Sequence, residues 1–138
     1  MTERELFRYK QEYKRLLRAE EELRVHEEKM YSAASPRLTF LPQDHNDSGG
    51  KLPYMADRAD ILRLDVERAR IRVCDASGLL EYVEWLLDKE SQREFLHYHY
   101  RKFLDYTALE KKLHRSKRSL YRDRRGILAK VAGITYII

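Results

Sequence analysis

The chain has 138 residues, with 28 Lys and Arg against 23 Asp and Glu, and a formal net charge of +5. Its single cysteine excludes an intrachain disulfide framework and is typical of a reducing compartment, so we expect a cytoplasmic protein. No run of 18 apolar residues is present and the charged opening residues do not resemble a secretory signal, so we expect neither a membrane span nor a signal peptide. A charged fraction of 37% beside 43% hydrophobic residues, with 5 Gly and 3 Pro, predicts an all-α protein.

The first predicted element is a long helix over residues 2–31. Thr2 followed by Glu5 is a capping-box pattern, which satisfies free amides at a helix start. Glu20 and Glu27 interrupt the apolar stripe, which favours a short antiparallel partner helix over a long coiled coil. The apolar residues recur at spacings of three, four and seven and share one face: Leu6, Tyr9, Tyr13, Leu16, Leu23 and Met30.

Residues 32–54 are predicted to be a linker loop, because they hold the three prolines and a Gly-Gly pair. A second helix is predicted over residues 55–76. Small residues in its apolar seam let a neighbouring helix approach closely, so we expect residues 1–76 to form an N-terminal antiparallel helical hairpin that serves as an interaction arm. Cys74 lies beside the seam and is expected to be buried or half-buried. The seam steps by three and four: Met55, Ala59, Leu62, Val66, Ala69 and Val73.

The pair Ser77-Gly78 predicts a break, after which residues 77–138 form a C-terminal domain. Ser116 is placed to cap the last helix. The apolar tail GITYII, from residue 133, is expected to pack on the body of the protein or on a second copy. Four helices are predicted in this domain, over residues 79–87, 91–103, 106–113 and 117–131.

The last two helices have the spacing of a helix-turn-helix, because about three residues join them. In such a motif the first helix holds the second at a fixed angle through apolar residues. Leu109 and Leu113 supply those of the first helix. The inner face of the second helix is expected to hold Leu120, Ile127 or Leu128, and Val131.

All of the excess positive charge lies in residues 107–138, which hold nine Lys and Arg against two Asp and Glu. A concentrated basic segment indicates contact with nucleic acid. Asp123, among the arginines, is expected to form an ion pair on the helix surface. The side chains expected to contact base edges from the second helix are Lys117, Arg118, Ser119 and Arg122. Those expected to contact phosphates are Lys111, Lys112, Arg115, Arg124 and Arg125. About five neutralised phosphates predict a slope of log affinity against log salt near −4 to −5.

These residues resemble the C-terminal helix-turn-helix of sigma-factor-like proteins, in which an R-x-x-L helix precedes an I-A-x-x-L-x-x-S-x-x-x-V-Y-R core. The similarity covers roughly residues 79–131. The layout of the chain, with its Ser35-Pro36 linker, also resembles phage transcriptional regulators of the ArpU/RinA type. That resemblance implies a phage or prophage regulator of late genes acting in a bacterial host cell. The matching positions are Arg93, Phe95, Leu96, Leu109, Leu113, Ser116, Leu120, Tyr121 and Arg122.

Three positions depart from the sigma-like motif. Glu110 stands where the motif has a small residue, and a carboxylate at a helix crossing costs free energy unless it is paired or faces solvent. His114 stands where the motif has Gly, in a turn that favours positive φ. Arg115 stands where the motif has an apolar residue.

No catalytic or metal site is expected, and no cofactor. His97 and His99 are two positions apart, which is the wrong spacing for a zinc pair on one helix face. We therefore predict a regulator that binds double-stranded DNA, with RNA polymerase or a second copy of the chain as further partners. The alternatives are a protein-interaction adaptor whose basic helix binds an acidic partner, and an RNA-binding protein. Most of the ten tyrosines have helical spacings typical of a core, whereas Tyr121 and Tyr136 remain open to base stacking.

Overall fold

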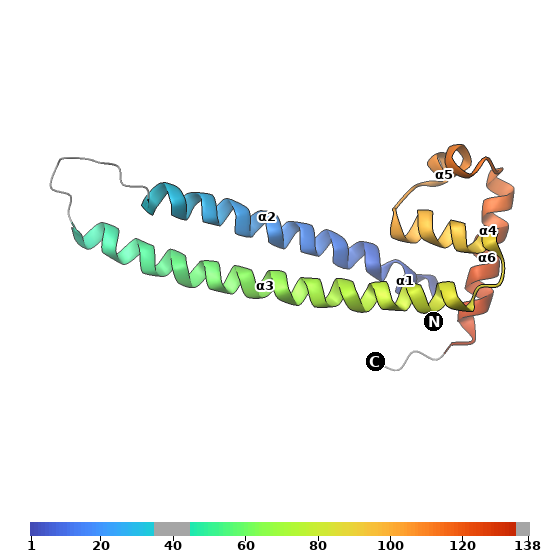
Figure 1. Cartoon of the computed structure of the whole chain (residues 1–138), viewed down its shortest axis with the longest axis horizontal. Helices are drawn as coiled ribbons and strands as arrows, with labels where there is room; N and C mark the ends of the chain where they lie inside the picture. Colours follow the sequence, from blue (N-terminus) through green and yellow to red (C-terminus); the bar gives the residue numbers. More distant parts are fainter. Residues whose placement is uncertain (35–44, 135–138) are drawn as a thin grey trace. The chain divides into compact units, whose positions relative to one another are not determined.

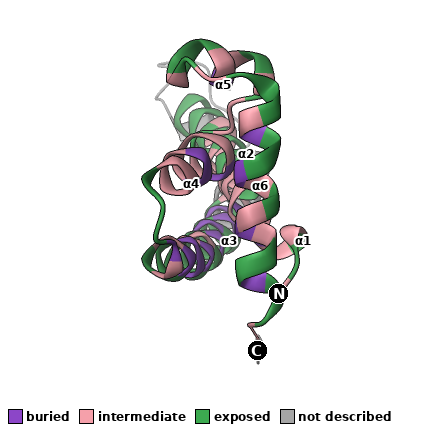
Figure 2. Cartoon of the chain, turned by 90° about the vertical axis from the view of Figure 1, so that its right-hand side faces the viewer, coloured by how far each residue is buried: buried purple, intermediate pink, exposed green. Residues whose placement is uncertain are grey.

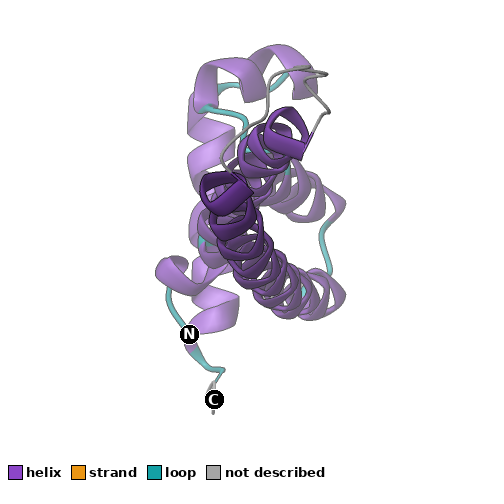
Figure 3. Ribbon diagram, turned by 90° about the vertical axis from the view of Figure 1, so that its left-hand side faces the viewer, coloured by secondary structure: helices purple, strands orange, loops and turns teal. Residues whose placement is uncertain are grey.

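A computed structural model describes the backbone of residues 1–34 and 45–134 and the side chains of residues 1–32 and 55–134. Every regular element in these ranges is a helix (Figure 3), so the prediction of an all-α protein is confirmed. Expectations for residues 35–44 and 135–138, including most of the apolar tail, lie outside the described residues. In chain order (Figure 1) the elements are α1 (Glu3–Leu6), α2 (Arg8–Ala34), α3 (His45–Leu86), α4 (Glu90–Phe95), the π-helix η1 (Leu96–Arg101), α5 (Tyr106–Leu113) and α6 (Lys117–Ala132).

The chain divides into two compact units. We call residues 14–71 the arm unit, and residues 1–13 together with 72–138 the head unit. The division falls inside α2 and α3, whereas the sequence suggested a boundary at residues 76 and 77. The first 13 residues therefore belong to the same unit as the basic C-terminal helices.

In the arm unit, segments of α2 and α3 run antiparallel and side by side (Figure 1). The Nε2 atom of His26 donates to the carbonyl oxygen of Met55 at 2.7 Å. Further along the pair, Arg70 lies 3.9 Å from Glu20. Among the described side chains of α3 in this unit, four are buried, and all four belong to the predicted seam: Ala59, Leu62, Val66 and Ala69.

Helix α3 continues through Ser77-Gly78, so the predicted break and the separate helix over 79–87 are wrong. The apolar seam explains the continuity, because it keeps its steps of three and four beyond Val73. Gly78 is exposed and off the seam, and its cost of about 1 kcal/mol in a helix is smaller than the gain from burying several seam residues. The residues that extend the seam are almost fully buried: Ala76, Leu80, Val83 and Leu87.

Two smaller expectations for α3 are also corrected. The helix begins at His45, ten residues before the predicted start, and so includes Gly49, Gly50 and Pro53, for which the sequence predicted a loop. Cys74 is exposed, not buried. It follows Val73 directly, and a step of one residue turns a side chain about 100° away from the seam.

The core of the head unit is formed by α3, α4, η1, α5 and α6, with Leu6 from α1 (Figure 2). Tyr100 and Phe95 are the largest of its fully buried side chains. The predicted helix over 91–103 changes from α to π geometry at Leu96. A π-helix brings residues five apart onto one side, which allows both Phe95 and Tyr100 to face the core.

The first residues of the chain are part of this core. The backbone N–H of Thr2 donates to the carboxylate of Glu5 at 2.8 Å, as the capping-box pattern predicts. The Phe7 ring lies 5.0 Å from the Tyr100 ring, measured between centroids. Ile134 packs against the core and accepts a hydrogen bond from the N-terminal ammonium group at 2.7 Å.

Candidate nucleic-acid interface

Both bounds of α5 and of α6 lie within one residue of the predicted bounds. The Asp105 carboxylate caps α5 by accepting from the Ala108 N–H at 2.8 Å. The Ser116 hydroxyl caps α6 by accepting from the Ser119 N–H at 3.3 Å, as predicted. Between them His114 has φ 54° and ψ 43°, so the turn takes the left-handed conformation that the motif requires.

Glu110 has a role that the sequence did not suggest. Its Oε1 accepts a hydrogen bond from the backbone N–H of Lys117 at 3.0 Å. This carboxylate thus satisfies a free amide at the start of α6 and lies where the helix dipole favours negative charge. The departure from the motif at this position therefore supports the turn.

The apolar faces of α5 and α6 meet as predicted. Leu109, Leu120, Ile127 and Val131 are fully buried in the head core. Leu113 and Leu128 are partly buried and pack against it. One side of α6 is therefore held by the core, while its other side is exposed (Figure 2).

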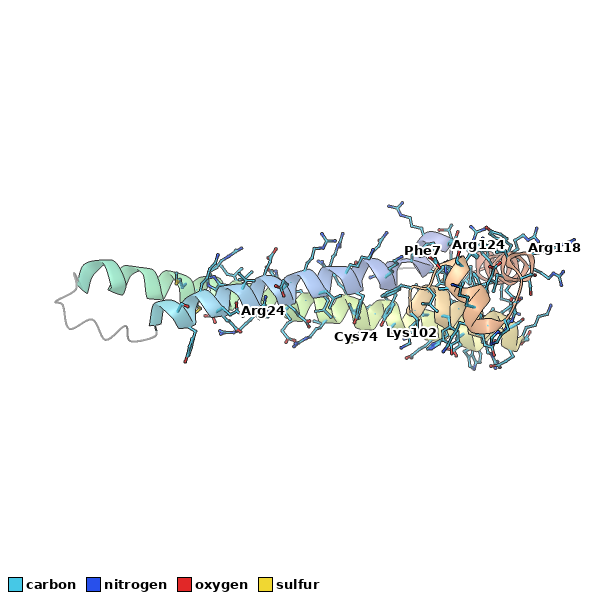
Figure 4. All side chains as sticks on the ribbon, turned by 90° about the horizontal axis from the view of Figure 1, so that it is seen from above. Phe7, Arg24, Cys74, Lys102, Arg118 and Arg124 are labelled. Atoms are coloured by element: carbon cyan, nitrogen blue, oxygen red, sulfur yellow. The ribbon has the colours of Figure 1, made fainter. Side chains whose placement is uncertain are left out.

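The exposed side of α6 carries four cationic residues, which we call the basic face: Lys117, Arg118, Arg122 and Arg125. Arg118 projects outward from the helix (Figure 4). Within the described parts of the chain no carboxylate forms an ion pair with any of the four. Ser119 is half-buried beside them.

Arg115 does not belong to this face, which corrects its assignment as a phosphate ligand. Its side chain is only 19% exposed and forms ion pairs with Glu94 and, at 2.8 Å, with Asp123. It also donates to the carbonyl oxygen of Ser91 at 3.2 Å. The guanidinium group therefore ties the turn before α6 to α4, and its charge is compensated inside the head unit.

The sequence suggested that Asp123 forms an ion pair on the helix surface, but this residue is buried. It is 7% exposed and accepts hydrogen bonds from Arg115 and, at 3.1 Å, from the Ser91 hydroxyl. A buried carboxylate requires such partners, because removing a charge from water is costly.

Arg124, for which the sequence predicts a phosphate contact, already has a carboxylate partner. Its Nε donates to Glu3 at 2.8 Å and one terminal nitrogen donates at 2.5 Å. The Tyr100 hydroxyl donates to the same carboxylate at 2.9 Å. These hydrogen bonds, with that from Arg124 the strongest, hold the pKa of Glu3 below its ordinary value.

Lys111 and Lys112 are exposed near the end of α5. The Lys112 ammonium group lies 5.8 Å from the centroid of the Tyr98 ring. Lys112 also borders a surface hollow of about 610 Å³ that is lined by three carboxylates, those of Glu84, Glu90 and Glu94. The assignment of Lys111 and Lys112 to phosphates stays a prediction.

The sequence left open the role of Tyr121, and the structure places this residue among the arginines. Its side chain is 45% exposed, and its ring lies 4.7 Å from the Tyr106 ring between centroids. A second hollow, of about 470 Å³, is lined by Arg118, Tyr121, Arg124 and Arg125. The position of Tyr121 between arginines on α6 was the available signal in the sequence.

The two histidines of η1 are His97 and His99. His99 is half-buried, and its Nδ1 donates to the Leu104 carbonyl oxygen at 2.8 Å. Burial lowers the pKa of this imidazole. In the residues that the structure describes, no group of three or more His, Cys, Asp or Glu could hold a metal ion. In the same residues no helix has both the length and the apolar character that a bilayer span requires.

Comparison of the chain with known protein families, with curated proteins and with solved structures gave no match.

Proposed function

We propose that this chain is a transcription regulator that binds double-stranded DNA by placing α6 in the major groove. The observation that carries the proposal is the basic face of α6, in which four cations have no carboxylate partner in the described structure while the opposite side of the helix is fixed in the core. A rigid helix that presents unpaired cations matches the charge and width of the groove.

Within this proposal the residues have different roles. Lys117, Arg118, Ser119 and Arg122 lie in the first turns of α6, from which a recognition helix contacts base edges. The phosphate ligands that remain after Arg115 and Arg124 are set aside are Lys111, Lys112 and Arg125. With Arg115 and Arg124 occupied internally, the expected slope of log affinity against log salt becomes about −3, less steep than the sequence predicted.

The test is fluorescence anisotropy with duplex DNA selected from a random pool, at several salt concentrations. The double variant Arg118→Ala, Arg122→Ala is expected to weaken binding by about 30-fold or more, since each bidentate contact to a base contributes about 1–3 kcal/mol. The matched control Arg63→Ala, Arg70→Ala removes the same charge from exposed arginines of the arm unit and is expected to change affinity less than about threefold. Equal losses in the two variants would show a non-specific charge effect and contradict the proposal.

A second candidate function, a protein-interaction adaptor, is favoured by the arm unit. Ile61, Leu64 and Ile71 are each at least half exposed on α3 and offer apolar surface to a partner. For an adaptor we expect DNA retention at low salt alone and no selected sequence. A selected sequence that is palindromic would instead add a twofold dimer to the leading proposal.

A further inference from the structure

The hollow lined by Arg118, Tyr121, Arg124 and Arg125 differs from the rest of the basic face, because it contains an aromatic ring. Tyr121 is three residues after Arg118 and four before Arg125, so the three side chains are neighbours on the exposed side of α6. The Tyr106 ring contacts the Tyr121 ring and supports it from one side. The phenol ring is thus held in place yet 45% exposed.

The charges around the hollow favour an anion. Glu3 already compensates Arg124, whereas Arg118 and Arg125 have no carboxylate partner in the described structure. Two guanidinium groups in this position can bind a phosphate group, and guanidinium is the side chain best suited to that geometry.

The size of the hollow and its aromatic lining indicate a ligand larger than a phosphate ion. Its volume of about 470 Å³ is within the range of small-molecule sites, which is about 300–1,000 Å³. A base stacked on an aromatic side chain contributes about 1–3 kcal/mol, and every base has a face for such stacking. A phosphate beside a planar ring is the chemistry of a nucleotide.

We infer that this hollow binds one nucleotide of the DNA whose base has left the helical stack, with its phosphate between Arg118 and Arg125 and its base against Tyr121. At such a nucleotide Arg118 contacts the phosphate in place of a base edge. The inference rests on the proposed function and specifies its substrate further. Paired bases are stacked inside the duplex and cannot present a face to Tyr121, so the site favours DNA with an unpaired base over fully paired DNA.

The experiment compares two duplexes of the sequence selected from the random pool, each containing the fluorescent base 2-aminopurine. In one duplex this base is unpaired in a single-nucleotide bulge, and in the other it is paired with thymine. We expect about tenfold tighter binding to the bulged duplex, which corresponds to about 1.4 kcal/mol, together with a change in 2-aminopurine fluorescence on binding.

Two variants separate stacking from DNA shape. Tyr121→Phe keeps the ring and is expected to keep the preference for the bulge. Tyr121→Leu keeps an apolar contact for Tyr106 and is expected to lose the preference while it retains affinity for the paired duplex. Circular dichroism and thermal unfolding of both variants check that the head unit remains folded.

The outcomes distinguish this inference from the proposed function. Equal affinity of the unaltered protein for both duplexes, or a preference that persists in Tyr121→Leu, overturns the nucleotide site and leaves duplex binding intact. Failure to bind either duplex overturns both proposals. Stronger binding to the same bulge in an RNA duplex overturns DNA as the ligand.

Discussion

The two units of the chain are stabilised by different means. In the arm unit the buried residues among the described side chains of α3 are two alanines, a valine and a leucine. Ion pairs there, such as Arg70 with Glu67, have both side chains more than half exposed. In the head unit the largest buried side chains are aromatic, and the pair of Arg115 with Asp123 is nearly removed from water. The described seam of the arm unit therefore buries small and medium side chains, whereas the head unit also buries aromatic rings and an ion pair.

The largest expected effect comes from the aromatic core. Phe95→Ala removes a fully buried ring and is expected to lower the free energy of unfolding by about 3–5 kcal/mol, because a cavity remains. Val66→Ala in the seam of the arm unit is expected to cost about 1.5–2 kcal/mol for two lost methyl groups. Urea denaturation followed by circular dichroism measures both values. A cost for Val66→Ala equal to that for Phe95→Ala would contradict the contrast between the units.

The ion pairs of the two units are expected to differ in the same way. Arg115→Ala leaves Asp123 buried with the Ser91 hydroxyl as its remaining partner, and is expected to cost about 3 kcal/mol. Arg70→Ala, which breaks an exposed pair of the arm unit, is expected to cost a few tenths of a kcal/mol. Chemical denaturation measures the two losses, and the salt slope of DNA binding is the second measurement. A stable Arg115→Ala protein with a reduced salt slope would restore Arg115 as a phosphate ligand.

The sequence predicted the parts of the fold that local patterns determine. The bounds of α5 and α6 follow from the caps Asp105 and Ser116 and from apolar spacing, and they agree with the structure. The break at Ser77-Gly78 was predicted wrongly because local preference was weighed above a seam that continues on both sides of it. Residues 76, 80, 83 and 87 already show that continuity in the sequence.

The charge partners could not be predicted in this way. Glu94 lies 21 residues from Arg115, and Glu3 lies 121 residues from Arg124. No helical periodicity relates such positions, because tertiary packing alone brings them together. The sequence of a basic segment therefore gives the amount of positive charge. Tertiary packing determines which of its cationic side chains have carboxylate partners and which remain available to a ligand.

The ion pair of Glu3 and Arg124 gives the head unit a dependence on pH. Because the pKa of Glu3 is lower in the folded protein than its ordinary value of 4.5, this carboxylate stabilises the fold above that pH. The contribution is lost as the pH falls through the lower folded pKa. Glu3→Gln is expected to cost about 1.5 kcal/mol at neutral pH and to flatten the loss of stability in this acidic range.

Thermal unfolding between neutral pH and pH 3 measures this difference. The control is Glu21→Gln, since Glu21 pairs with Arg24 on the exposed surface of the arm unit. An unchanged pH profile in Glu3→Gln would show that other carboxylates govern acid unfolding of the head unit.

The last expected effect is a gain in stability at the turn before α6. His114 has φ 54°, a conformation that costs a residue with a Cβ atom about 1–2 kcal/mol and costs glycine little. His114→Gly is expected to raise the free energy of unfolding by about 0.5–1 kcal/mol, because glycine also loses more chain entropy on folding. His114→Ala keeps the Cβ atom and is expected to give no gain. Equal stabilisation by alanine and glycine would assign the cost to the imidazole, whereas a gain from glycine alone assigns it to the backbone that orients the basic face.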